Sequence, residues 1–157
     1  RLFQIVREQL GYAYSVGSSF TFNLDTGVFR ASGASNNDVT ADAIRQILTE
    51  IDTLRTETLA PDVVAKARGS LIGVESLALE SYQSFVNAVT VLKLNDLPLS
   101  RIANRSARFA VVDEGDVRAV AETYIHPEQF VIVVVGDASV LEEPLSEFGT
   151  VEVIDPH

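Results

Sequence analysis

The sequence of 157 residues contains no cysteine, no methionine, no tryptophan and only 2 histidines. Without cysteine, the chain can form no disulfide, no thiolate metal site and no cysteine nucleophile. Its most apolar run, residues 130–136, is far shorter than the roughly 20 residues that a membrane-spanning helix needs. A chain that lacks methionine and begins at Arg1, already inside an amphipathic pattern, is expected to be part of a larger protein or a processed product.

Basic residues are nearly absent from the C-terminal part of the chain. Residues 1–112 carry 11 basic and 11 acidic side chains, whereas residues 113–157 carry Arg118 alone against 11 acidic ones, so the net charge of −10 comes from the second stretch. A surface of this sign repels phosphate, which argues against a nucleic acid partner. The length and the hydrophobic content of 46% favour a single folded domain over residues 1–157.

The spacing of apolar residues changes early in the chain. Helical spacing predicts that the chain begins in a helix and that Gly11 ends it. A spacing of two then predicts a strand over residues 12–22, with bulky side chains on one face and small ones on the other. A turn at residues 24–27 and a return strand over residues 28–34 complete a predicted hairpin.

The rest of the chain alternates between helical and strand patterns. Helices are predicted over residues 44–54, 61–78, 82–92, 99–111, 113–124 and 140–148. The β-branched run at 130–135 predicts a strand buried on both faces, and residues 151–154 predict a last strand. This order predicts an α+β sandwich, with helices packed on one face of a mainly antiparallel or mixed sheet. Gly69 and Gly73 predict close packing of their helix against a neighbour.

The two histidines do not form a zinc-binding pattern. A catalytic zinc needs about three protein ligands, usually with two histidines on one helix face. Neither His126 nor His157 has a second histidine and a carboxylate at ligand spacing. We therefore expect this chain to bind no metal by itself.

The tripeptide Asp25-Thr26-Gly27 is the signature of aspartic peptidases, in which two carboxylates share one proton and activate water. A chain with one copy would have to dimerise across the site. The tripeptide also lies at a predicted hairpin tip, where aspartate and glycine are favoured for turn geometry alone. The turn is the favoured interpretation, and a homodimeric aspartic peptidase that depends on Asp25 is the alternative.

A different pair of side chains comes from the first helix and the strand after it. Arg7 lies near the end of the helix and Tyr14 lies at the start of the strand, so both could reach the same region. A guanidinium and a phenol are suitable donors to a peptide carbonyl or a carboxylate. Residue chemistry alone also allows the plainer explanation of a surface arginine and a half-buried tyrosine.

Three blocks of residues, in order along the chain, resemble the C-terminal domain of the M16 zinc metallopeptidases, the family of pitrilysin, insulin-degrading enzyme and mitochondrial processing peptidase. The first block is Phe3, Val6-Arg7-Glu8, Gly11 and Ala13-Tyr14-Ser15-Val16. The second is Ala65-Lys66, Ser70-Leu71-Ile72-Gly73 and Leu79-Glu80-Ser81. The third is Asp116-Val117, Val120-Ala121, Tyr124, Pro127 and Val133-Val134-Val135-Gly136-Asp137.

The resemblance implies a clamshell of two similar α+β domains, of which one binds zinc through His-x-x-Glu-His and a distant glutamate. That motif is absent here, so the chain resembles the C-terminal, non-zinc half. The arginine and tyrosine that hold the substrate backbone in that half correspond to Arg7 and Tyr14, with Tyr12 as a second candidate for the tyrosine. The resemblance also implies that the hairpin edge binds substrate as an added strand.

Several expectations follow from this resemblance. The full enzyme would be a zinc peptidase, while this chain would bind no zinc and would be inactive alone. Its partners would be a peptide or polypeptide substrate and a zinc-bearing M16 domain or subunit. The alternative is a non-catalytic scaffold or core subunit with the same fold. Family domains begin with a strand, a helix and a strand before the arginine-bearing helix, so the N-terminal part of the domain is expected to be absent from this sequence.

Overall fold

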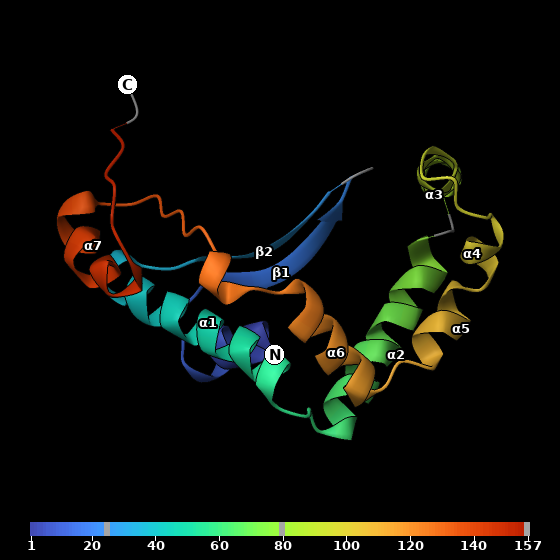
Figure 1. Ribbon diagram of the computed structural model, residues 1–157, viewed down its shortest axis with the longest axis horizontal. Helices are drawn as coiled ribbons and strands as arrows, with labels where there is room; N and C mark the ends of the chain where they lie inside the picture. Colours follow the sequence, from blue (N-terminus) through green and yellow to red (C-terminus); the bar gives the residue numbers. More distant parts are fainter. Residues whose placement is uncertain (24–25, 79–80, 156–157) are drawn as a thin grey trace. The chain divides into compact units, whose positions relative to one another are not determined.

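The computed structural model describes residues 1–23, 26–78 and 81–155 (Figure 1). Four residues that the sequence singles out lie outside the described residues: Asp25 at the hairpin tip, Leu79 and Glu80 of the second sequence block, and His157. The contacts divide the chain into two compact units. The first unit contains the hairpin and the C-terminal segment, and the second contains most of residues 54–124.

The first unit begins with a π-helix, η1 (Phe3–Gln9), followed by a turn into the hairpin. Gly11 has φ of +68°, a left-handed conformation that glycine adopts without a Cβ clash, and it ends the helix as the sequence predicts. The strands β1 (Ser15–Phe22) and β2 (Gly27–Ala34) pair antiparallel, with Phe20 opposite Phe29. The predicted hairpin is therefore confirmed.

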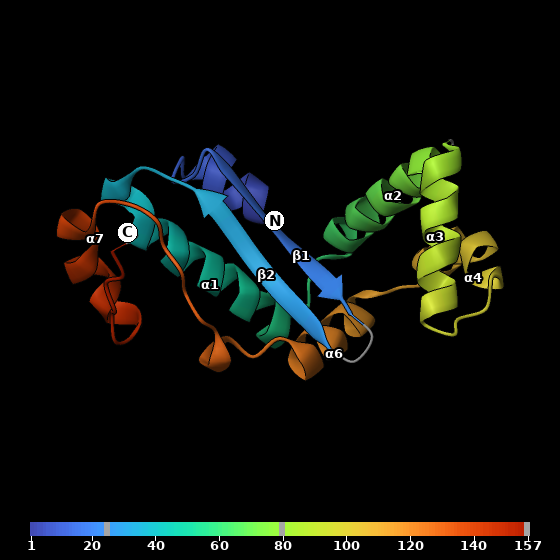
Figure 2. The same ribbon diagram turned by 90° about the horizontal axis from the view of Figure 1, so that it is seen from above.

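Helix α1 (Thr40–Thr56) follows the hairpin through the short 3₁₀ turn η2 (Asn37–Val39). Figure 2 shows α1 beside the hairpin. Val6 of η1, Ala13 of the turn and Ala43 of α1 form the buried cluster where these elements meet. Apolar positions at helical spacing on α1 thus anchor the junction between η1 and β1.

The C-terminal segment of the first unit contains η3 (Pro127–Gln129), α7 (Ala138–Leu145) and η4 (Ser146–Phe148). The Asp137 side chain caps α7 by accepting a hydrogen bond of 3.0 Å from the backbone N–H of Ser139. Arg45 of α1 donates to Glu147 of η4 and to Asp42, and these hydrogen bonds raise the pKa of Arg45 above its usual value. The pair Arg45–Glu147 therefore holds η4 against α1.

Two predicted strands do not form in the described structure. Residues 130–135 and 151–154 are irregular, and the described sheet contains only β1 and β2. The predicted burial on both faces is also wrong, because Val131, Val133 and Val135 are 87%, 81% and 98% exposed. A β-branched run supplies strand propensity, but a strand needs a neighbouring segment for its ladder hydrogen bonds, and no described segment pairs with these residues.

The second unit is helical. Its helices are α2 (Pro61–Ala78), α3 (Tyr82–Leu94), α4 (Ser100–Ala103), α5 (Arg105–Ala110) and α6 (Glu114–Tyr124). Helix α2 packs against α5, and Arg68 of α2 donates a hydrogen bond of 3.1 Å to the carbonyl oxygen of Val112. The predicted helix over residues 99–111 is divided in two at Asn104.

The predicted close packing at Gly69 and Gly73 is wrong for the part of the chain that the structure describes, because a Cβ built at either position meets no described atom within 4 Å. Their spacing places both glycines on one helix face, but spacing cannot show whether another segment covers that face. With one antiparallel hairpin and helices in the described part of the chain, the predicted α+β class is confirmed.

Candidate functional site

The candidate site lies where η1 turns into β1. Two backbone hydrogen bonds fix this turn: the N–H of Tyr12 donates to the carbonyl of Val6 at 2.9 Å, and the N–H of Tyr14 donates to the carbonyl of Ala34 at 2.7 Å. The first bond ties the turn to the helix and the second ties it to the end of β2. Tyr14 is therefore held at the start of the hairpin, within reach of the helix that carries Arg7.

The structure brings Arg7 and Tyr14 together. The guanidinium carbon Cζ of Arg7 lies 5.6 Å from the centroid of the Tyr14 ring, within the range of a cation–π contact. Tyr14 is 82% exposed and Arg7 is exposed as well. The two side chains thus lie side by side with their polar groups open to a ligand.

Tyr12, the second candidate for the tyrosine, has a different environment. It is half-buried and packs against the cluster of Val6, Ala13 and Ala43. Tyr14 is the tyrosine that contacts the guanidinium. After the left-handed turn at Gly11, Tyr12 packs against the buried cluster, whereas Tyr14 is exposed directly before β1.

Phe3 completes the surroundings of Arg7. Cζ of Arg7 lies 4.6 Å from the centroid of the Phe3 ring, which is closer than the ring of Tyr14. Sequence reasoning assigned Phe3 no role, although its position four residues before Arg7 on one helix was a signal that could have found it. Exposed cation–π contacts contribute about 0.5–1 kcal/mol each.

An open hollow of about 500 Å³ lies beside Tyr14. Its lining comes from the turn and from the end of the hairpin: Gly11, Tyr12, Ala13, Tyr14, Ala34, Ser35, Asn36 and Val39. The side chain of Arg7 forms no ion pair or hydrogen bond with any residue that the structure describes. The Arg7 guanidinium lies 5.6 Å from the ring of Tyr14, which lines the hollow. Its N–H groups and the phenol of Tyr14 are suited to donate to a carbonyl or carboxylate oxygen placed beside Tyr14.

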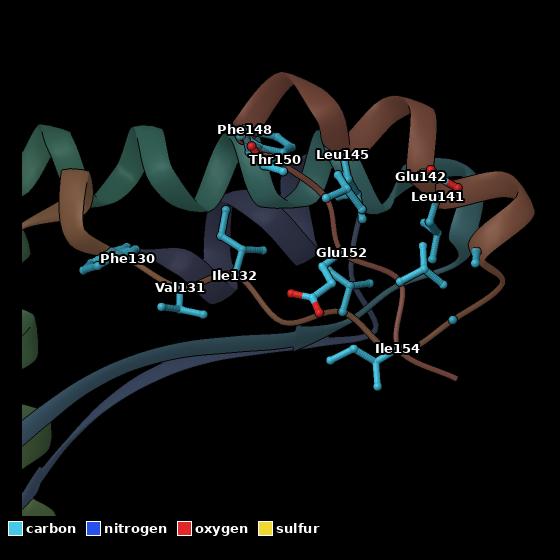
Figure 3. Close-up of a pocket in the computed structure, with 16 residues that line it drawn as sticks. Phe130, Val131, Ile132, Leu141, Glu142, Leu145, Phe148, Thr150, Glu152 and Ile154 are labelled. Atoms are coloured by element: carbon cyan, nitrogen blue, oxygen red, sulfur yellow. The ribbon is translucent and has the colours of Figure 1, made fainter. Parts of the chain in front are cut away.

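A second hollow, of about 470 Å³, lies between residues 130–136 and the segment from α7 to residue 154 (Figure 3). Apolar side chains supply much of its lining, among them Phe130, Ile132, Leu141, Leu145 and Phe148. The charged side chains in the lining are Glu142 and Glu152, so the described lining offers no cation to a ligand. This hollow therefore lacks the cationic hydrogen-bond donor that Arg7 provides at the junction of η1 and β1.

The described residues do not fit a zinc ion. Among residues 1–23, 26–78 and 81–155, no group of three or more histidine, aspartate or glutamate side chains could hold a metal. His126 has Glu128 at 3.4 Å from its Nδ1, which gives one histidine and one carboxylate. In this same part of the chain, no helix has the length and apolar character needed to cross a membrane.

The first 71 residues, which contain Phe3, Arg7 and Tyr14, match the family model described as the Peptidase M16 inactive domain. An uncharacterized zinc protease of Streptomyces coelicolor is 33% identical over 121 residues, which amounts to 77% of this chain. The matched region spans 26% of that protein, so the chain corresponds to a minor part of its relative. Together, the matches confirm the resemblance to the M16 peptidases: the chain belongs to the M16 peptidase family, and its residues 1–71 match the inactive domain of that family.

Proposed function

We propose that this chain is the substrate-binding, non-zinc domain of an M16-type zinc protease, and that Arg7 and Tyr14 hold the backbone of a peptide or unfolded polypeptide. The observation that carries this proposal is the distance of 5.6 Å between the Arg7 guanidinium and the Tyr14 ring, with both side chains exposed and Tyr14 lining a hollow. We further propose that residues 1–157 form a single domain.

Arg7 and Tyr14 offer complementary donors to a substrate. The guanidinium carries five N–H groups and a fixed positive charge, while the phenol carries one O–H group that can also accept. A hydrogen bond to a charged group contributes about 1.5–3 kcal/mol and a neutral one about 0.5–1.5 kcal/mol. Two donors that reach one peptide segment fix its orientation as well as its position, and such positioning contributes to rate as well as affinity.

The hairpin adds a second means of holding substrate. The described sheet has the order β1–β2, so β1 has one edge without a strand partner, and that edge begins directly after Tyr14. An extended peptide could pair with this edge through its backbone. We propose that substrate binds as an added strand on β1, with one end beside Arg7 and Tyr14.

The metal of the proposed enzyme would be held elsewhere. The Streptomyces relative is named a zinc protease, and the described residues of this chain offer no metal-binding group. We therefore propose that a zinc-bearing M16 domain or subunit supplies the metal. This chain would contribute substrate binding and no metal ligand.

The test uses the intact protease, in which this chain is combined with its zinc-bearing domain or subunit. We expect Arg7→Ala to lower kcat/KM for a fluorogenic peptide by about 10- to 100-fold, and Tyr14→Phe to lower it by about 3- to 10-fold. Arg101→Ala and Tyr82→Phe are matched controls, because both residues are exposed and lie in the second unit. Zinc content, measured for each variant, should stay unchanged.

Three results would overturn parts of the proposal. Full activity in both Arg7→Ala and Tyr14→Phe would refute the proposal that these two side chains bind the substrate. A loss in Tyr12→Phe without a loss in Tyr14→Phe would move the tyrosine role to Tyr12. If the zinc-bearing partner gains no proteolysis when this chain is added, the chain is a non-catalytic scaffold or core subunit.

A further inference from the structure

The orientation of Arg7 depends on aromatic rings. Many exposed arginines are held by a carboxylate, as Arg118 is by Glu122 at 2.8 Å. Arg7 has no such partner among the described residues, and its guanidinium carbon instead lies over the rings of Phe3 and Tyr14. A long side chain without such contacts would sample many rotamers in water. The conformational entropy that it loses on binding would lower the affinity for substrate.

The backbone of η1 places Phe3 beside Arg7. The helix has hydrogen bonds of π type, with the N–H of Leu10 donating to the carbonyl of Ile5 at 3.0 Å. Phe3 and Arg7, four residues apart in this helix, lie on the same side of it, and the ring contact of 4.6 Å confirms that the side chains meet. Segments of π-helix occur often at functional sites because they change the direction of side chains on a helix.

We propose that Phe3 is a positioning residue: its ring holds the Arg7 guanidinium beside Tyr14 and leaves the N–H groups available to the substrate. A ring contact suits this task better than an ion pair would. A carboxylate partner would occupy N–H groups and neutralise the charge, whereas an aromatic ring interacts with the cation through its π electrons. This inference rests on the proposed function of Arg7, since Phe3 acts through that side chain.

The test compares Phe3→Leu, which removes the ring, with Phe3→Tyr, which keeps it, in the intact protease. We expect Phe3→Leu to lower kcat/KM by about two- to fivefold, which is the size of one exposed cation–π contact, and Phe3→Tyr to restore the activity. In an Arg7→Ala background, Phe3→Leu should have no further effect, because the side chain that it positions is gone. Phe85→Leu is a matched control, since Phe85 is 47% exposed and Phe3 is 45% exposed.

A spectroscopic readout separates positioning from a general effect on folding. In protein labelled with ¹⁵N-arginine, the Nε–Hε signal of Arg7 is assigned by its loss in Arg7→Lys. The ring current of Phe3 should shift this signal, so Phe3→Leu should move it toward the position of a solvated arginine, and Phe3→Tyr should not.

The two possible failures give different results. If Phe3→Leu leaves both the Arg7 signal and kcat/KM unchanged while Arg7→Ala is impaired, the positioning role of Phe3 is refuted and the proposed function stands. If Arg7→Ala keeps full activity, the proposed role of Arg7 in substrate binding fails, and with it any role for Phe3 in that function. A loss in Phe3→Leu that persists equally in the Arg7→Ala background would also refute positioning, because Phe3 would then act by another route.

Discussion

Two glycines of the hairpin provide a matched pair for testing how closely its strands approach each other. A Cβ built at Gly33 of β2 lies 2.9 Å from the backbone oxygen of Ser15 and 3.5 Å from Cβ of Val16. A backbone oxygen cannot rotate away as a side-chain end can, so Gly33→Ala must push the strands apart. A Cβ at Gly17 of β1 meets no atom of the described residues within 4 Å, so Gly17→Ala fits without moving any of them.

The difference between the two variants isolates the contact. Both substitutions reduce the freedom of the unfolded chain, which stabilises the folded state by about 0.4–1 kcal/mol, and this contribution cancels in the comparison. Overpacking costs about 1–3 kcal/mol, and it applies to Gly33→Ala alone. We therefore expect Gly33→Ala to have a free energy of unfolding about 1–3 kcal/mol lower than Gly17→Ala, which itself should be slightly more stable than the unchanged protein.

Hydrogen exchange on the intact protein reports this difference locally. The amide of Tyr14, which donates to the carbonyl of Ala34 at 2.7 Å, is the natural probe, because it closes the end of the hairpin where Gly33 lies. Its protection should fall in Gly33→Ala and persist in Gly17→Ala. Equal protection in the two variants would refute the reasoning, since it would mean that the strands accommodate the added methyl group without opening.

Two further changes test one contact of the C-terminal segment and one contact of α1. Gly136→Ala should cost about 1 kcal/mol in denaturant unfolding, because its Cβ would lie 2.6 Å from Cδ1 of Leu141 and 2.8 Å from Oδ1 of Asn37, and such side-chain ends shift more easily than backbone. Asn37→Ala should recover part of the loss, and no loss at all would contradict the contact. Arg1 donates to Glu50 at 2.6 Å and 2.9 Å, and Glu50 is 6% exposed. Arg1→Ala should therefore cost about 1–3 kcal/mol, and less in a Glu50→Gln background, whereas additive effects would show that the two side chains do not interact.

Features that depend on neighbours in the sequence were predicted well. The period of two over residues 12–22 predicted β1, and the turn signals predicted its pairing with β2, because a hairpin needs only local contacts. The meeting of Arg7 and Tyr14 was predicted for the same reason, since a helix, one left-handed glycine and a strand bring them together. Substrate binding by the two residues stays a prediction.

Features that depend on distant segments were predicted poorly. The run at 130–135 has strong strand propensity, but pairing is decided by what lies beside it, and no described segment does. Helical spacing likewise could not tell whether the faces of Gly69 and Gly73 are covered. The ranking of Tyr14 before Tyr12 came from the resemblance to the M16 family, and the structure has Tyr14 beside Arg7 and Tyr12 against the buried cluster.

The short connection between η1 and β1 has a mechanical consequence. Phe3, Arg7 and Tyr14 lie within twelve consecutive residues, joined by one tight turn and fastened by the backbone bond from Tyr14 to Ala34. The distances among these three side chains are thus set within a single stretch of backbone. If this chain swings as a rigid body against the proposed zinc-bearing partner, Phe3, Arg7 and Tyr14 move together, so their distance to that partner changes while the distances among them do not.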